Sequence, residues 1–124
     1  MGTRNAPPVT PAAFQVLLAL ASGQAHGYRI MGFISELTGG SVQIGPGTLY
    51  RTLGRLVADG LVEQAPGPED PGDAPHDARR RYYRLTEQGW QVARREAALH
   101  ARLAQAAADA GLLDGTGQWK DRSA

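Results

Sequence analysis

Cysteine is absent from the 124-residue sequence, which excludes disulfides, thiolate metal sites and a cysteine nucleophile. Long hydrophobic runs are absent too, since the longest, Val16–Ala21, is far too short to span a bilayer. Residues 1–10 lack the apolar core of a secretory signal. We therefore expect a soluble, cytoplasmic protein with no membrane contact.

Lysine is nearly absent as well, because twelve of the thirteen Lys and Arg side chains are arginine, and the formal net charge is only +1. Five acidic residues and no Lys or Arg lie between Glu63 and Asp77, whereas four arginines and no acid lie between Arg79 and Arg84. Arginine suits bidentate recognition of phosphate and guanine. A GC-rich genome would also favour arginine, so composition alone leaves a nucleic-acid partner open.

With 42% hydrophobic and 20% charged residues, the chain is typical of one globular domain with a short extension. A first helix is predicted to begin at Pro11, with Thr10 as its N-cap, and to end at Gly23. A second is predicted from about His26 to Thr38. Their apolar stripes comprise Phe14, Leu17, Leu18 and Ala21 in the first, and Ile30, Ile34 and Leu37, with Met31 beside them, in the second.

A third helix is predicted from Pro46 to Ala58, after a short extended piece at Val42 and Ile44. Its apolar face comprises Leu49, Leu53, Leu56 and Val57. The opposite face carries Thr48, Arg51 and Arg55, because successive residues are about 100° apart. Such a helix can pack on a core and still offer donors to a ligand, although an ordinary solvated face would have the same pattern.

Residues 61–65 and 79–85 are predicted to form a β-hairpin around the loop 66–78, which contains four prolines and two glycines. Alternation places Arg79, Arg81, Tyr83 and Leu85 on one face of the second strand, and Arg80, Tyr82 and Arg84 on the other. An alanine-rich helix then follows from Thr86, its N-cap, toward Leu113. Its apolar stripe has the spacing of a helix–helix seam and comprises Val92, Leu99, Leu103, Ala106, Ala110 and Leu113.

This order of elements predicts a mainly α fold with a small β-hairpin, namely a winged helix-turn-helix with a C-terminal dimerisation helix. The predicted organisation is a flexible N-terminal arm (1–10), a winged helix-turn-helix DNA-binding domain (11–86), a C-terminal dimerisation helix (87–113) and a disordered tail (114–124). The third helix is short enough to enter the major groove of double-stranded DNA.

Several segments resemble the PadR family of bacterial transcriptional regulators. They are FQVLLAL (14–20), HGY (26–28), GPGTLYR (45–51), LGRL (53–56), GLVE (60–63) and RRRYYRLT (79–86). The resemblance covers about residues 11 to 100 and carries weight through the order and spacing of the segments. It implies a homodimer whose C-terminal helices pack across the two-fold axis and against the first helix. It also implies repression that a small molecule relieves, and the single short C-terminal helix resembles the family's small subgroup.

Candidate DNA-contacting residues are Thr48, Tyr50, Arg51, Arg55, Arg79, Arg80 and Arg81. Internal pairing with Asp73 and Asp77 is the alternative for the three hairpin arginines, and Tyr50 could instead be a simple core residue. Some members of the family stack planar ligands on a tryptophan midway along the last helix. Here Trp90 lies at its start and His100 in its middle. The sequence thus departs from that stacking arrangement. Packing of the first and last helices in a dimer would instead leave an apolar cavity, and the candidate pocket for a small aromatic or amphiphilic effector comprises Phe14, Leu17, Trp90 and His100.

Catalysis and metal binding are not expected. The three histidines fall on separate predicted elements without zinc-ligand spacing, and Gly45-Pro46-Gly47-Thr48 lacks the lysine of a phosphate-binding loop. We expect no cofactor. The alternative function is a winged helix used only as a protein-interaction module, which would leave the arginine face of the third helix without a role.

Overall fold

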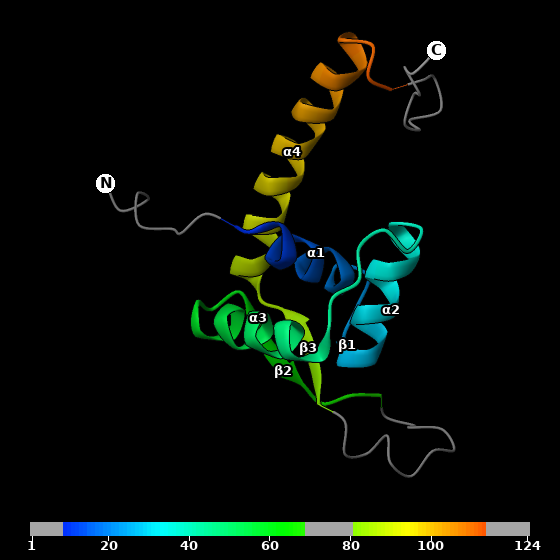
Figure 1. Ribbon diagram of the computed structural model, residues 1–124. Coiled ribbons are helices and arrows are strands. Elements are labelled where there is room, and N and C mark those ends of the chain that lie inside the picture. The colour runs from blue at the N-terminus through cyan, green and yellow to red at the C-terminus, as the bar shows by residue number, and fades with distance from the viewer. Residues whose placement is uncertain (1–8, 69–80, 114–124) are drawn as a thin grey trace. The chain divides into compact units, whose positions relative to one another are not determined.

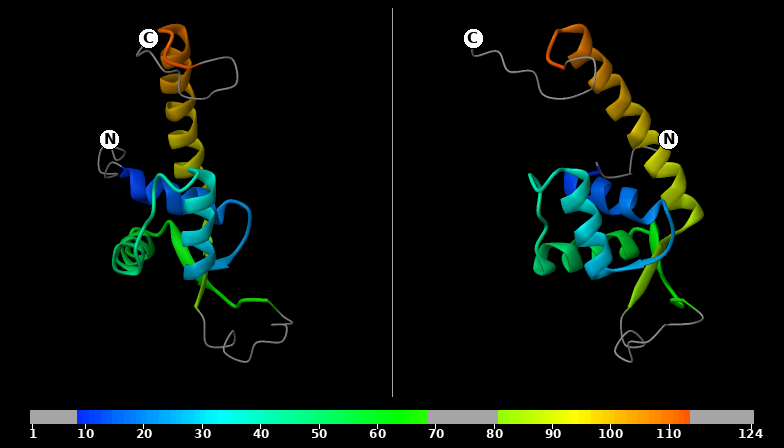
Figure 2. Two further views of the ribbon diagram at one scale, coloured as in Figure 1. Left: turned by 45° about the vertical axis from the view of Figure 1, so that its right-hand side comes forward. Right: turned by 90° about the vertical axis from the view of Figure 1, so that its right-hand side faces the viewer.

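A computed structural model describes residues 9–68 and 81–113 of the chain. Its elements, in chain order, are α1 (Pro11–Leu20), β1 (Ala25–His26), α2 (Gly27–Leu37), α3 (Pro46–Ala58), β2 (Val62–Ala65), β3 (Tyr82–Leu85) and α4 (Glu87–Asp109). In Figure 1 and in both views of Figure 2, α1, α2 and α3 pack together beside the small sheet. This is a mainly helical winged helix-turn-helix, as the sequence predicts.

Helix α1 begins as predicted, with the Thr10 hydroxyl accepting a hydrogen bond from the Ala13 amide at 3.1 Å. The face that it buries differs from the predicted stripe. Of that stripe only Leu17 is buried, together with Val16, Ala19 and Leu20. Because α1 is apolar on nearly every side, periodicity alone could not identify the side that faces the core.

Helix α2 is capped by His26, whose Nδ1 accepts a hydrogen bond from the Arg29 amide at 3.3 Å. Ile30 and Ile34 are fully buried, as predicted, and contribute to the core beneath α1 and α3. Leu37 was predicted on the same stripe but is 58% exposed. It lies in the last turn, where the helix has passed beyond the core.

The described residues form a three-stranded antiparallel sheet in the order β1-β3-β2. The sequence predicts a short extended piece at Val42 and Ile44, but these residues lie in no strand, so that prediction is wrong. The third strand of the sheet is β1, before α2. Instead, the Val42 amide donates to the Thr38 hydroxyl at 3.0 Å, a local turn that replaces a sheet partner. In β3, Tyr83 and Leu85 are buried as the alternation predicts.

Helix α3 has the predicted bounds, and Leu49, Leu53 and Leu56 are buried in the core. Val57, predicted on the same face, is 41% exposed near the end of the helix.

The start of α4 is joined tightly to the turn that follows α3. Thr86 donates through its amide to the Leu61 carbonyl at 3.1 Å and through its hydroxyl to the Gly60 carbonyl at 2.7 Å. The Gly89 amide donates to the Thr86 hydroxyl at 3.0 Å, so Thr86 is the predicted N-cap. A Cβ at Gly89 would collide with the Leu61 carbonyl oxygen. Only glycine therefore allows this close approach of two backbone segments.

The chain divides into two compact units, one ending at Ala93 and the other beginning at Arg94, and α4 runs through the boundary. The helix ends at Asp109, short of the predicted Leu113, and Gly111 then has a positive φ of 82°. Several predicted segments lie outside the described residues: the arm up to residue 8, residues 69–78 of the hairpin loop, the first two residues of its second strand (79–80) and the tail (114–124).

Candidate nucleic-acid interface

The exposed face of α3 is the candidate surface for nucleic acid. Gly45 occupies the N-cap and Pro46 the first turn, and among the described residues no side chain caps the helix start. The leucine face fixes the helix on the core, which leaves Thr48, Arg51 and Arg55 exposed on the other side. The predicted division of α3 into a packed face and a donor face is present in the structure.

Thr48 and Arg51 are brought into direct contact. Arg51 Nη2 donates to Thr48 Oγ1 at 3.3 Å, and Arg51 Nη1 lies 3.6 Å from the place that a Cβ would take at Gly47. The guanidinium therefore lies along the first turn of α3. A guanidinium has five N–H donors, so this bond to Thr48 leaves others for a base edge or a phosphate.

Arg55 is held more loosely. Its Nε lies 3.9 Å from Asp59 Oδ2, and the two side chains are 72% and 35% exposed. Exposed pairs at this separation contribute little, because solvent screens them. Arg55 can therefore exchange Asp59 for a phosphate at small cost.

Tyr50 is neither a core residue nor fully solvated. Its side chain is 50% exposed, and its hydroxyl lies over Gly27, where a Cβ would collide with it. The ring thus crosses from α3 to the first turn of α2. The sequence alone did not predict that the Tyr50 ring packs over Gly27, because the contact joins residues far apart in the chain.

The hairpin supplies a second basic element. Arg81 is exposed, and the other two candidate arginines, Arg79 and Arg80, lie outside the described residues. Three residues after Arg81, and on the opposite face of the predicted strand, Arg84 Nε donates to Glu63 Oε2 at 2.8 Å across the β2–β3 pair. Arg84 is therefore engaged with a carboxylate within the sheet.

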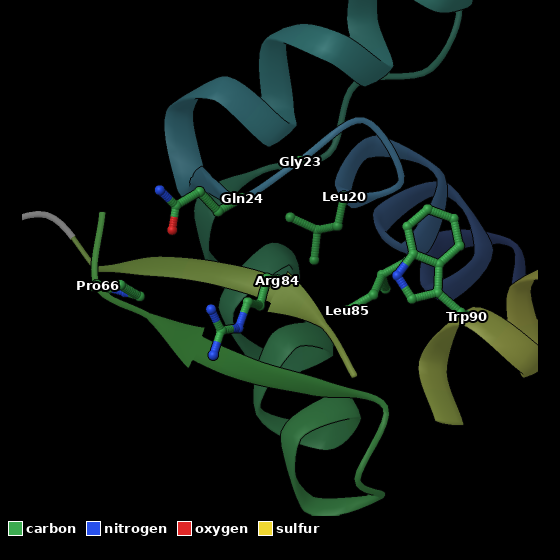
Figure 3. Close-up of a pocket in the computed structure, with 7 residues that line it drawn as sticks. All are labelled: Leu20, Gly23, Gln24, Pro66, Arg84, Leu85 and Trp90. Carbon is green, nitrogen blue, oxygen red and sulfur yellow. The ribbon is translucent and has the colours of Figure 1, made fainter. Parts of the chain in front are cut away.

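An open pocket of about 400 Å³ lies beside the sheet at the start of α4 (Figure 3). Its lining residues are Leu20, Gly23, Gln24, Pro66, Arg84, Leu85 and Trp90. Of the four residues predicted for an effector pocket, only Trp90 lines it. Leu17 is fully buried in the core, and Phe14 is half-buried. His100 belongs to the second unit, where its Nε2 lies 3.9 Å from Glu96 Oε1.

The residues predicted for dimerisation divide between the two units. Val92 is half-buried and packs against the core of the first unit. Further along α4, Leu99 and Leu103 are 40% and 58% exposed, and Ala106 and Ala110 are exposed as well. Leu113 is half-buried beyond the helix end. Most of the predicted seam is thus unpaired apolar surface on the chain taken alone.

Within the described residues, no group of three His, Asp or Glu side chains is arranged to hold a metal ion. Across the same residues, no helix has the length and apolar character that crossing a membrane requires.

The fold and the exposed face of α3 define a winged helix-turn-helix protein. Residues 16–95 match the sequence profile described as the transcriptional regulator PadR-like family, and the chain belongs to that family. This confirms the resemblance, and the family consists of transcriptional regulators rather than enzymes.

Over 88 residues the chain is 41% identical to an uncharacterised 37.1 kDa protein in transposon TN4556 of Streptomyces fradiae. The match covers 71% of this chain and 22% of that protein, so the chain spans about a fifth of the length of this curated relative.

Two solved structures show the same fold. A transcriptional regulator from Clostridium thermocellum has a TM-score of 0.62 at 24% identity, over 79% of this chain and 87% of its own. A PadR family transcription regulator from hypervirulent Clostridium difficile also has a TM-score of 0.62, at 18% identity, over 81% of this chain and 97% of its own.

Proposed function

We propose that the protein is a sequence-specific DNA-binding repressor, active in the cytoplasm as a homodimer on an inverted-repeat operator. The observation that supports this most directly is the Thr48–Arg51 pair on the exposed face of α3. In winged helices the N-terminal part of the recognition helix reaches base edges. Arg51 can then donate to guanine O6 and N7, and Arg55 and Tyr50 can meet phosphates on either side.

The hairpin arginines would contact the DNA backbone next to this helix. Arg81 is exposed for that role, and Arg79 and Arg80 are assigned to it from the sequence alone. Phosphate contacts of this kind position the protein and add affinity without reading sequence. The carboxylates of the hairpin loop would be repelled by phosphates, so the base of the hairpin would bind and its tip would stay away.

Dimerisation would use the exposed apolar face of α4. A seam that covers Leu99 and Leu103 of two chains removes apolar side chains from water, at about 1.5–3 kcal/mol per fully buried leucine. Two winged helices related by a two-fold axis would read half-sites separated by about one helical turn or a multiple of it. A small aromatic or amphiphilic effector would release the operator by favouring a different separation of the two α3 helices.

The proposal can be tested by titrating the protein against duplex DNA at several salt concentrations. Arg51→Ala is expected to weaken binding to the preferred duplex by about 1–3 kcal/mol, or roughly 5- to 150-fold, and to relax preference at one base position per half-site. Arg102→Ala is the matched control, because it removes an exposed arginine of α4 that the proposal does not place on DNA.

A parent protein that binds duplex DNA with no salt dependence, or not at all, would contradict DNA binding as the function. It would favour a protein-interaction module instead. If Arg51→Ala and Arg102→Ala had equal effects, α3 would not be the element that reads the bases.

A further inference from the structure

Gly54 lies in the middle of α3, where glycine is unfavourable. Glycine is the poorest helix former after proline, because its backbone loses the most conformational freedom on folding. Three structural causes commonly require it there: a positive φ, a close backbone contact or a packed side chain that leaves no room for a Cβ. The structure of α3 can be checked for each of them.

None of the three causes applies to Gly54 within the described residues. Its φ is not positive, and a Cβ built at this position would meet no atom within 4 Å. The contrast with Gly27 and Gly89 is clear, because a Cβ at either position would collide with Tyr50 or with the Leu61 backbone. Packing among the described residues therefore does not account for the glycine at position 54.

The position of Gly54 on the helix places it beside the candidate DNA-contacting arginines. It lies three residues after Arg51 and directly before Arg55, so it is exposed on the face that carries both arginines. The leucines buried beneath α3 lie on the other side. Any ligand that Arg51 and Arg55 bind together would cover the bare helix backbone at Gly54.

We propose that Gly54 is a specificity-determining residue of α3, which lets the helix backbone lie directly against the base edges of duplex DNA. This inference rests on the DNA-binding function proposed above. The major groove is about 12 Å wide and a helix with its side chains measures about 10–12 Å, so the fit is tight. Without a side chain at its centre, α3 sits deeper, and Arg51 reaches the bases from its place along the first turn.

Two substitutions separate this steric role from a role of charge. Gly54→Ala adds one methyl group and improves helix propensity, whereas Gly54→Lys adds a long side chain and a cation. Gly32→Ala is the matched control, because Gly32 is an exposed glycine inside α2 whose Cβ would also meet nothing within 4 Å. Thermal unfolding and affinity are measured for each variant, with a duplex selected by the parent protein and a scrambled duplex.

Gly54→Ala and Gly32→Ala are both expected to raise the melting temperature, by about 4–8 °C, since alanine stabilises an exposed helix. Only Gly54→Ala should then bind the selected duplex more weakly, by about tenfold, because a methyl group is forced into a close contact. Gly54→Lys should lose affinity for the selected duplex and gain affinity for the scrambled one, since its charge favours any DNA.

The proposal fails if Gly54→Ala keeps the parental affinity for the selected duplex. It also fails if Gly32→Ala loses as much affinity, or if Gly54→Lys tightens binding to both duplexes equally. A parent protein that selects no duplex would instead overturn the proposed function, and this inference with it. The parent titration therefore distinguishes the two failures.

Discussion

The junction between α4 and the turn after α3 gives the sharpest prediction about stability, and the substitution is Gly89→Ala. The added Cβ would collide with the Leu61 carbonyl oxygen and lie 3.0 Å from the Leu61 carbonyl carbon. These are backbone atoms, so no side chain can rotate away to relieve the contact. The start of α4 must move, which also stretches the two hydrogen bonds from Thr86 to Gly60 and Leu61.

The magnitude follows from opposing terms. Alanine in place of glycine stabilises a helix by about 1 kcal/mol. The collision costs about 1–3 kcal/mol, and each weakened hydrogen bond up to about 0.5–1.5 kcal/mol. We therefore expect a net loss of about 2 kcal/mol in the free energy of unfolding. For a domain of this size that lowers the melting temperature by about 8–16 °C.

Thermal unfolding followed by circular dichroism measures this difference, with all variants at one protein concentration because dissociation of a dimer shifts the midpoint. Gly32→Ala is again the matched control, and its melting temperature should rise rather than fall. A Gly89→Ala variant as stable as the parent would refute the close backbone contact between α4 and Leu61.

Three further predictions concern other parts of the chain. Leu99→Asp combined with Leu103→Asp should give a folded monomer in sedimentation, because like charges then meet in the proposed seam; a dimer of parental mass would rule that seam out. Replacing Arg79 and Arg80 by alanine should weaken binding to all duplexes similarly and make its salt dependence shallower, whereas an unchanged salt slope would remove both from the interface. Thr10→Ala should lower the free energy of unfolding by about 1 kcal/mol in urea titrations through loss of the α1 cap, and an unchanged midpoint would show that the cap contributes nothing.

Helix α3 and strand β3 were predictable because each is strongly amphipathic, so the sequence shows which single face of each packs against the core. Helix α1 was located correctly by its proline and threonine, but its buried face was not, because apolar residues surround it. Strand β1 was missed because Ala25 and His26 are too few for an alternating pattern, and only their pairing with β3 makes them a strand. Leu37 and Val57 continue an apolar period past the point where the core ends.

The candidate interface, too, was predictable from the sequence only in part. That Thr48, Arg51 and Arg55 share one exposed face follows from helical spacing alone. The bond between Thr48 and Arg51 is local, but its formation depends on rotamers that spacing does not determine. Two contacts, that of the Tyr50 hydroxyl with Gly27 and that of Gly89 with Leu61, join residues far apart in the sequence. They could therefore be identified only in the folded structure.

Selection of bound fragments from random duplex DNA, with the region upstream of the gene included, tests the central claim most directly. If the protein reads DNA as a dimer through α3, the enriched fragments will share an inverted repeat, and Arg51→Ala will relax one position in each half-site. Fragments without a shared sequence, or an Arg51→Ala variant with the parental profile, would contradict sequence-specific binding by α3.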